Sequence, residues 1–142
     1  MTEKFLGIPY PVKKNPRGFF YSQGGVDQIK SDMLILLLTN PGERVMNPSY
    51  GTPLRRLFFE PNDETIKEQA KAMIANSIKQ WEPRIAIQQI EVLSGVDENS
   101  LDINDDKTEL DHILFIRIIF FDPENIQEVQ ELTLEVPLSG GA

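Results

Sequence analysis

The chain of 142 residues has no cysteine and only one histidine, His112. Without thiols it can form no disulfide, supply no thiolate nucleophile and build no cysteine-ligated zinc or iron–sulfur site. One imidazole is also too few for a multi-histidine metal centre, so we expect neither a metal nor a cofactor. His112 follows Asp111 at the start of an apolar segment, which favours a histidine at a strand edge over a catalytic one.

Long hydrophobic runs are also missing. The longest, Met33–Leu38, has six residues, whereas a membrane-spanning helix needs about 20. The first ten residues have neither a basic start nor a long apolar segment, so a secretory signal is not expected. We expect a soluble protein, made in the cytoplasm and not inserted into a membrane.

The charge is negative and unevenly distributed. Fourteen Lys and Arg stand against 22 Asp and Glu, giving a formal net charge of −8. Seven acids and one base lie within residues 95–111, whereas residues 1–60 have a net charge of +3. Nucleic-acid binding is not expected, because attraction to phosphates needs a broad basic surface. The segment 95–111 is expected to be an exposed surface loop.

The first 25 residues predict an extended arm that wraps around the protein or docks on another one. They contain three prolines, four glycines and five aromatic residues, with no apolar repeat of helical period. The aromatic content argues against simple disorder. We expect one domain over residues 26–137, a size that can enclose a core, and a flexible tail over residues 138–142.

Helical periodicity appears twice in the first half of the domain. Apolar residues three and four apart predict a helix over Asp27–Leu38, and a short helical turn is expected over Leu54–Phe58. A second long helix is predicted after Asn62 or Asp63 as N-cap, and Pro83 ends it. Its expected buried stripe consists of Ile66, Ala70, Met73, Ile74, Ser77, Ile78 and Trp81.

The second half has the two-residue period of strands. Strands are predicted over Arg84–Leu93, Ile113–Phe121 and Gln130–Val136, and Asp122-Pro123-Glu124-Asn125 is expected to be the turn between the last two. Helices followed by strands favour an α+β fold over a βαβ array. We therefore predict an extended N-terminal arm and two main helices packed on a small antiparallel sheet formed by the C-terminal half.

The carboxylates suggest two sites, and each has a simpler explanation. Asp102, Asn104 and Asp106 have the first ligand spacings of an EF-hand loop. Lys107 stands at its glycine position and Ile113 at its final glutamate position, so a solvated hairpin loop is favoured.

Glu60, Asp63 and Glu64 could supply the two carboxylates of a glycoside hydrolase. Asp63 and Glu64 are adjacent and fit the start of a helix, where acids complement the helix dipole. No catalytic residue is therefore predicted.

Two stretches place an acid and an arginine beside proline or glycine at a helix end. The first is Pro41-Gly42-Glu43-Arg44-Val45-Met46-Asn47-Pro48-Ser49-Tyr50-Gly51, which runs into Leu54 and Leu57 to Pro61. The second is Trp81-Glu82-Pro83-Arg84-Ile85. One explanation is helix termination with local Glu–Arg pairing. The other is a guanidinium held on a rigid turn to bind a carboxylate or backbone of a partner. Both explanations remain open at this point.

Taken in order, these stretches resemble the contractile-tail baseplate wedge family. This family includes the phage gene product W and gene product twenty-five proteins and the matching type VI secretion baseplate subunit. The resemblance covers about residues 5–94. The matching residues are Gly7-Ile8-Pro9-Tyr10-Pro11, Gly18-Phe19, Ile29, Leu37-Leu38-Thr39, Pro41-Gly42-Glu43-Arg44, Pro48, Tyr50-Gly51, Leu54, Phe58 to Pro61, and Trp81-Glu82-Pro83-Arg84.

The resemblance implies a structural, non-enzymatic subunit of a virion tail baseplate, assembled in the host cytoplasm. Six copies are expected around the tail tube, bound to the core bundle of other wedge proteins, to the tail sheath protein and to the tube or hub. The resemblance implies that Glu82, Pro83 and Arg84 bind the core bundle. Glu43, Arg44 and Tyr50 are further expected partner-binding residues. Two alternatives are a tail-associated, lysozyme-like peptidoglycan hydrolase and a cytosolic adaptor on the same fold.

The resemblance also implies sheath initiation through strand sharing. Such sharing needs an open sheet edge, where an added strand forms main-chain hydrogen bonds. The two C-terminal strands, Ile113–Phe121 and Gln130–Val136, are candidates for it. Thr133 is expected to lie on the shared edge and to bind the sheath.

Overall fold

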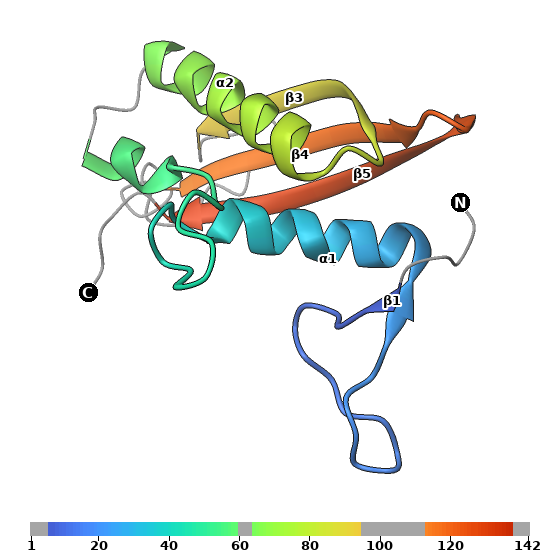
Figure 1. The fold of residues 1–142 in the computed structure, drawn as a ribbon. Helices are drawn as coiled ribbons and strands as arrows, with labels where there is room; N and C mark the ends of the chain where they lie inside the picture. Colours follow the sequence, from blue (N-terminus) through green and yellow to red (C-terminus); the bar gives the residue numbers. More distant parts are fainter. Residues whose placement is uncertain (1–5, 60–63, 95–112, 138–142) are drawn as a thin grey trace, which may run out of the picture.

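The computed structural model describes residues 6–59, 64–94 and 113–137. As the sequence predicts, the two long helices lie in the first part of the domain and the three long strands in the second. Figure 1 shows α1 and α2 beside a sheet of three long strands, so the predicted α+β fold is confirmed. The elements are β1 (Leu6–Gly7), β2 (Gln23–Gly24), α1 (Gly25–Leu38), the 3₁₀ helix η1 (Leu54–Phe59), α2 (Glu64–Trp81), β3 (Ala86–Ser94), β4 (Ile113–Asp122) and β5 (Asn125–Pro137).

The sheet is antiparallel, in the order β3-β4-β5, with β4 in the centre. Because side chains alternate between the two faces of a strand, one face is apolar and buried, and the other carries polar and apolar side chains in similar number. The buried side chains of the apolar face are Val92, Leu114, Ile116, Ile118, Phe120, Leu132 and Val136. On the opposite face, Glu91, Arg117 and Thr133 occupy one row across the three strands.

Both long helices place an apolar stripe in the core that they share with the sheet. In α1 the buried apolar residues are Ile29, Met33, Leu36 and Leu37. The predicted stripe of α2 is confirmed: Ile66, Ala70, Ile74, Ser77 and Ile78 are buried, and Met73 and Trp81 pack partly buried against the core. Within the described residues, none of the helices combines the length and hydrophobicity needed to cross a membrane.

The last strand is longer than predicted, beginning at Asn125 instead of Gln130. Asp122 pairs with Asn125 across a two-residue turn, and the Glu124 N–H donates to Asp122 Oδ1 at 2.9 Å. The next pair is Phe121 with Val129, so the register shifts and β5 bulges over residues 126–128 before regular pairing begins. The expected caps of α2, Asn62 and Asp63, lie outside the described residues, as do segment 95–111 and the tail 138–142.

The N-terminal arm leaves the start of α1 and projects away from the sheet (Figure 1). Its two ends pair as β1 and β2, with Leu6 opposite Gly24 and Gly7 opposite Gln23. The expected extended arm is therefore present in the described residues.

Candidate partner-binding site

Arg84 is the centre of a network of three charged side chains. Its Nε and Nη2 donate to Oε1 and Oε2 of Glu82, each at 2.6 Å, and Nη2 also donates to Asp32 Oδ2 of α1 at 2.7 Å. Glu82 has a side chain only 5% exposed, whereas that of Arg84 is 29% exposed. The explanation by local Glu–Arg pairing is therefore correct for this turn. Arg84 also links α1 to the end of α2 through its hydrogen bond to Asp32.

The chain reaches this arrangement because α2 ends abruptly. The Glu82 N–H still donates to the Ile78 carbonyl at 2.8 Å, but Pro83 has no N–H and disfavours helical geometry in the residue before it. The Arg84 N–H turns back to Glu82 Oε1 at 3.4 Å before β3 begins. Hydrogen bonds to Glu82, with a further one to Asp32, raise the pKa of Arg84, so its guanidinium stays charged.

A cluster of Arg44, Tyr50 and Trp81 lies beside this network. The Arg44 guanidinium lies 3.8 Å from the centre of the Tyr50 ring, a cation–π contact. Tyr50 in turn packs edge-on against Trp81, with ring centres 5.3 Å apart and an interplanar angle of 66°. Burial raises the pKa of the Tyr50 hydroxyl, although the charge of Arg44 opposes that shift.

The loop that carries Tyr50 is anchored on both sides. Thr52 is fully buried; its N–H donates to the Thr39 carbonyl at 2.9 Å and its Oγ1 to the Leu36 carbonyl at 3.2 Å. Gly51 has a φ of +129°, and a Cβ there would lie 2.5 Å from the Thr39 carbonyl oxygen. Only glycine fits this close approach of the two backbone segments, which fixes the position of Tyr50.

Glu43 does not pair with its neighbour Arg44. It accepts hydrogen bonds from the Asn40 N–H at 3.0 Å and from Asn40 Nδ2 at 2.7 Å, and it lies 3.8 Å from Nη1 of Arg55. The bonds from Asn40 lower the pKa of Glu43. Local Glu–Arg pairing is therefore wrong for this turn, because the loop folds Glu43 back onto the end of α1.

The structure thus connects the two stretches that the sequence analysis singled out, through the contact of Tyr50 with Trp81. The sequence analysis missed Asp32 and Gln28, two polar residues one turn apart on the amphipathic helix α1. Gln28 Nε2 donates to Asp32 Oδ1 at 2.8 Å and to the Ile8 carbonyl at 3.3 Å. Their four-residue spacing could have indicated that they share one face.

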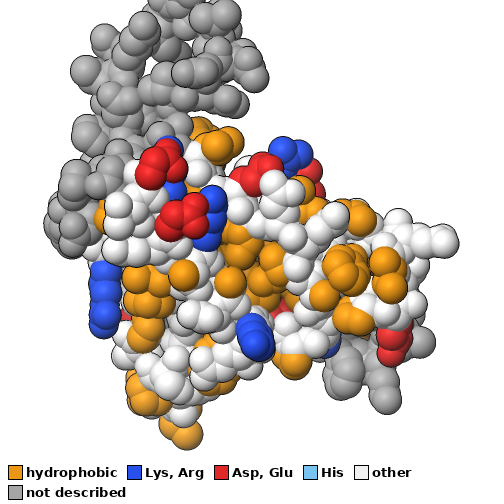
Figure 2. All heavy atoms as spheres, turned by 90° about the horizontal axis from the view of Figure 1, so that it is seen from above, with side chains coloured by type: hydrophobic (Ala, Val, Ile, Leu, Met, Phe, Trp, Pro, Cys, Tyr) orange, Lys and Arg blue, Asp and Glu red, His pale blue; other side chains and the backbone are white. Residues whose placement is uncertain are grey.

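An open hollow of about 420 Å³ lies beside the Glu82-Pro83 turn. Figure 2, which looks down on α2, shows hydrophobic side chains gathered across the middle of this face, with charged side chains at its margins. Apolar groups dominate the lining, which comes from the end of α2, the turn and the start of β3. The lining residues are Ala75, Ile78, Lys79, Glu82, Pro83, Ile85, Ala86 and Ile87.

Thr133 lies elsewhere, on β5, which is an edge strand of the described sheet. It stands opposite Arg117 of β4, and its Oγ1 donates to Glu131 Oε1 at 3.3 Å. Arg117 Nε and Nη2 hold Glu131 at 2.7 and 3.1 Å, and Nη1 reaches Glu91 at 3.5 Å. These bonds lower the pKa of Glu131.

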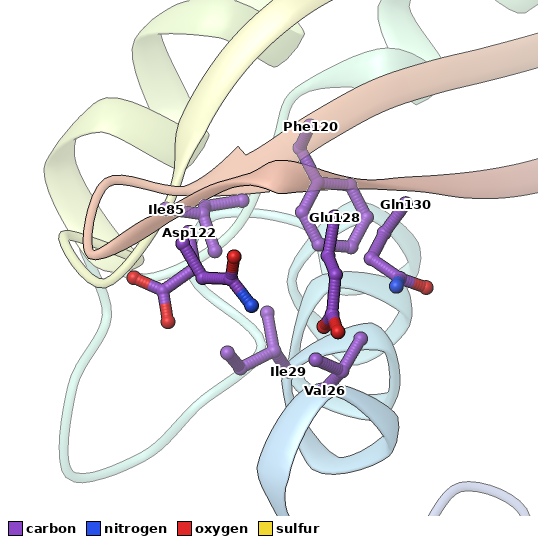
Figure 3. Close-up of a pocket in the computed structure, with 8 residues that line it drawn as sticks. Val26, Ile29, Ile85, Phe120, Asp122, Glu128 and Gln130 are labelled. Atoms are coloured by element: carbon purple, nitrogen blue, oxygen red, sulfur yellow. The ribbon is translucent and has the colours of Figure 1, made fainter. Parts of the chain in front are cut away.

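Two hollows lie where α1 meets β5. At the C-terminal end of α1, one of about 200 Å³ is lined by Leu37, Leu38, Asn40, Leu54, Arg55, Glu135 and Val136. At the other end, Figure 3 shows Val26 and Ile29 facing side chains of β4 and β5 across a space of about 20 Å³, room for little more than one water. Among the described residues, no group of three acids or histidines is placed to hold a metal ion.

Comparison with known proteins assigns a family. Residues 23–111 match the family model described as Baseplate wedge protein gp25. No curated protein sequence matches the chain.

Solved structures with the same fold include the following three. A candidate tail lysozyme from Geobacter sulfurreducens is 21% identical, with a TM-score of 0.64 over 81% of this chain and 92% of that one. A chain of the anti-feeding prophage baseplate is 19% identical, with a TM-score of 0.61 over 94% and 86%. A chain of the post-contraction pyocin R2 baseplate is 25% identical, with a TM-score of 0.50 over 89% and 97%. Since the family model matches more than half of the sequence, the chain belongs to the Baseplate wedge protein gp25 family and is a structural subunit of a contractile-tail baseplate.

Proposed function

We propose that the subunit joins the wedge core to the first sheath ring, and that it starts sheath assembly by pairing the outer edge of β5 with a strand of the sheath protein. The observation that carries this proposal is the long edge of β5. The strand has 13 residues, and within the described part of the chain it pairs with β4 alone. An unpaired edge of that length is a template for an added strand.

The hollow beside β5 adds specificity to such pairing. Side chains of an added strand alternate between the two faces of the sheet, so every second one points toward the helix layer. There the hollow offers Leu37, Leu38 and Leu54 as an apolar floor, and Leu38 is 45% exposed without a partner strand. Covering this surface would stabilise the joined sheet through the hydrophobic effect.

Charge also restricts which strand can pair. Glu128, Glu131 and Glu135 are exposed along β5, and charged residues on an edge hinder indiscriminate pairing. An acceptable strand should therefore carry lysine or arginine opposite these acids. The direct test is a proline in β5, Thr133→Pro, scored by the presence of sheath on assembled baseplates.

The wedge core is proposed to bind at the opposite side of the sheet. The turn of Glu82, Pro83 and Arg84 adjoins β3, and the sheet order places β3 and β5 on opposite edges. The network around Arg84 fixes the turn before binding, which reduces the entropy lost on association. Its apolar hollow would accept side chains of a helical bundle. Tyr50, in contact with Trp81 next to the turn, and Arg44 would add a second contact, with Glu43 on the same loop.

In this proposal the subunit is a bridge with one contact at each edge of its sheet. Six copies around the tail tube would then present six β5 edges to the first sheath ring. The tail tube or hub is a further expected neighbour. Family membership removes the basis for the alternative of a cytosolic adaptor, because it places the subunit in baseplates.

We further propose that the subunit has no catalytic activity. Glu64 is exposed in the first turn of α2, where it accepts a hydrogen bond from Lys67 Nζ at 2.7 Å. This is the usual environment of an acid at a helix start rather than that of a buried general acid. Glu60 and Asp63 lie outside the described residues.

A peptidoglycan suspension tests the absence of catalysis. The turbidity of the suspension should fall no faster with the purified subunit than with buffer alone. Clearing that disappears with Glu60→Gln or Glu64→Gln would instead establish a hydrolase.

A further inference from the structure

The N-terminal arm has a surface composition unlike that of the rest of the chain. Residues 6–24 contain three basic residues and no acid, although the chain as a whole has a net charge of −8. Most of their apolar side chains are exposed to solvent, and the arm projects away from the body (Figure 1). The exposed apolar residues are Leu6, Ile8, Tyr10, Val12, Phe19, Phe20 and Tyr21.

Hydrogen bonds within the tip of the arm hold its shape, although no other described element packs against it. Asn15 Oδ1 accepts the N–H groups of Arg17 and Phe19 at 2.9 and 3.0 Å, and the Asn15 N–H donates to the Phe19 carbonyl at 2.8 Å. The Tyr21 N–H donates to the Lys13 carbonyl at 2.9 Å, closing the loop below the tip. Gly18, with a φ of +85°, permits the tight turn.

The base of the arm is fixed to α1. Gln28, a buried residue of this helix, donates through Nε2 to the Ile8 carbonyl at 3.3 Å, and Pro9 is buried beside it. A Cβ on Gly7 would lie 2.4 Å from Gln28 Nε2, so glycine permits this close packing. The arm is therefore held at both ends, and its orientation is set before any partner binds.

From these features we propose that the arm is a docking surface for an acidic protein surface that has an apolar depression. Phe19 is 71% and Phe20 66% exposed, beside Arg17 at the tip. Exposed aromatics with arginine have the composition of the residues that dominate binding energy at protein interfaces. Lys13 and Lys14 add positive charge next to them, which an acidic partner complements. The ordered tip reduces the entropy cost of docking.

A protein partner fits better than a polyanion or a membrane. Nucleic acids are bound through a broad basic footprint, and three basic residues on an otherwise acidic chain do not provide one. Interfacial membrane binding usually relies on a long amphipathic helix, whereas the described arm is a looped ribbon. The neighbours of a baseplate subunit are, moreover, mainly proteins.

The test uses a photo-crosslinker in assembled baseplates of the parent particle. Phe19 is replaced by p-benzoylphenylalanine, and the joined peptides are identified by mass spectrometry after irradiation. We expect one main product, with a different protein and at a site surrounded by aspartate and glutamate. Lys13→Glu with Lys14→Glu should lower the yield about tenfold, because like charges then face each other.

The matched control is Arg56→Glu with Lys71→Glu, which makes the same charge change at η1 and α2 and should leave the yield unchanged. A second result would support the arm as a docking surface as strongly as a lower crosslinking yield. In that result the variant with Lys13→Glu and Lys14→Glu keeps its melting temperature but no longer enters baseplates, while the control variant still enters them. The proposal is overturned by a product with a second copy of this chain, with lipid or with nucleic acid. The absence of any crosslinked product would also overturn the proposal. So would an unchanged crosslinking yield in the variant with Lys13→Glu and Lys14→Glu.

Discussion

Arg84→Ala should lower the free energy of unfolding by about 2 kcal/mol at neutral pH. The substitution removes the cation that holds two carboxylates and leaves Glu82, 5% exposed, without its partner. A fully buried pair would lose more, but Arg84 and Asp32 keep some contact with water. Urea unfolding followed by circular dichroism measures the change, and Arg84→Lys should recover only part of the loss because it lacks the two-pronged geometry.

Arg117 provides the matched control for this prediction. It also bridges two carboxylates, those of Glu91 and Glu131, but on the solvent-exposed face of the sheet. Exposed ion pairs contribute little, so Arg117→Ala should leave the urea midpoint almost unchanged. Equal losses for the two variants would show that burial of the Arg84 network is not what stabilises the fold.

The Arg84 variant also tests the proposed wedge contact. Below its melting temperature the Arg84→Ala protein remains folded, yet it should fail to enter baseplates, since the turn has lost its fixed shape. Normal incorporation of the folded variant would refute the wedge contact and leave the stabilising role of the network intact.

Thr133→Pro should separate baseplate assembly from sheath assembly. Proline removes one N–H from β5, and its ring obstructs a neighbouring strand. An edge strand tolerates proline better than a central strand, so the subunit should fold and still enter baseplates. Sheath should then fail to polymerise on these baseplates, and electron microscopy should show bare tubes.

The control for this prediction is Thr133→Ala. It removes the hydroxyl that donates to Glu131 but keeps the main-chain N–H. Full sheath is expected on Thr133→Ala baseplates, because strand pairing uses the backbone. If Thr133→Pro baseplates also carry full-length sheath, β5 is not the attachment edge.

Most of the fold follows from local periodicity in the sequence. The stripe of α2 repeats at three- and four-residue spacing, and the same residues line the core. The first five residues of β5 were missed because Asn125, Gln127 and Glu128 suggest a loop. Among these five residues only Asn125 and Val129 pair with β4, opposite Asp122 and Phe121, so the strand bulges over residues 126–128. Such a bulge depends on how the two strands meet at the turn, which local propensity does not contain.

The site was predictable only in part. Proline and glycine at the helix ends pointed to the turns that carry Arg44 and Arg84. Asp32 is 52 residues before Arg84 in sequence, and no local pattern indicates that the two side chains meet. Whether Glu43 pairs with Arg44 or with Asn40 likewise depends on the path of the loop, which Gly51 and Thr52 fix through contacts with α1.

The central claim is that a sheath strand lies along the outer edge of β5. The chain has no cysteine, so a single introduced cysteine reports one position. Glu135→Cys is combined with cysteines placed along the strand of the sheath protein, and Gln88→Cys on β3 serves as the control. Adjacent strands lie about 5 Å apart, within reach of a disulfide. The account predicts that oxidised sheath–baseplate particles contain a disulfide at Glu135→Cys and none at Gln88→Cys, and the reverse result would contradict it.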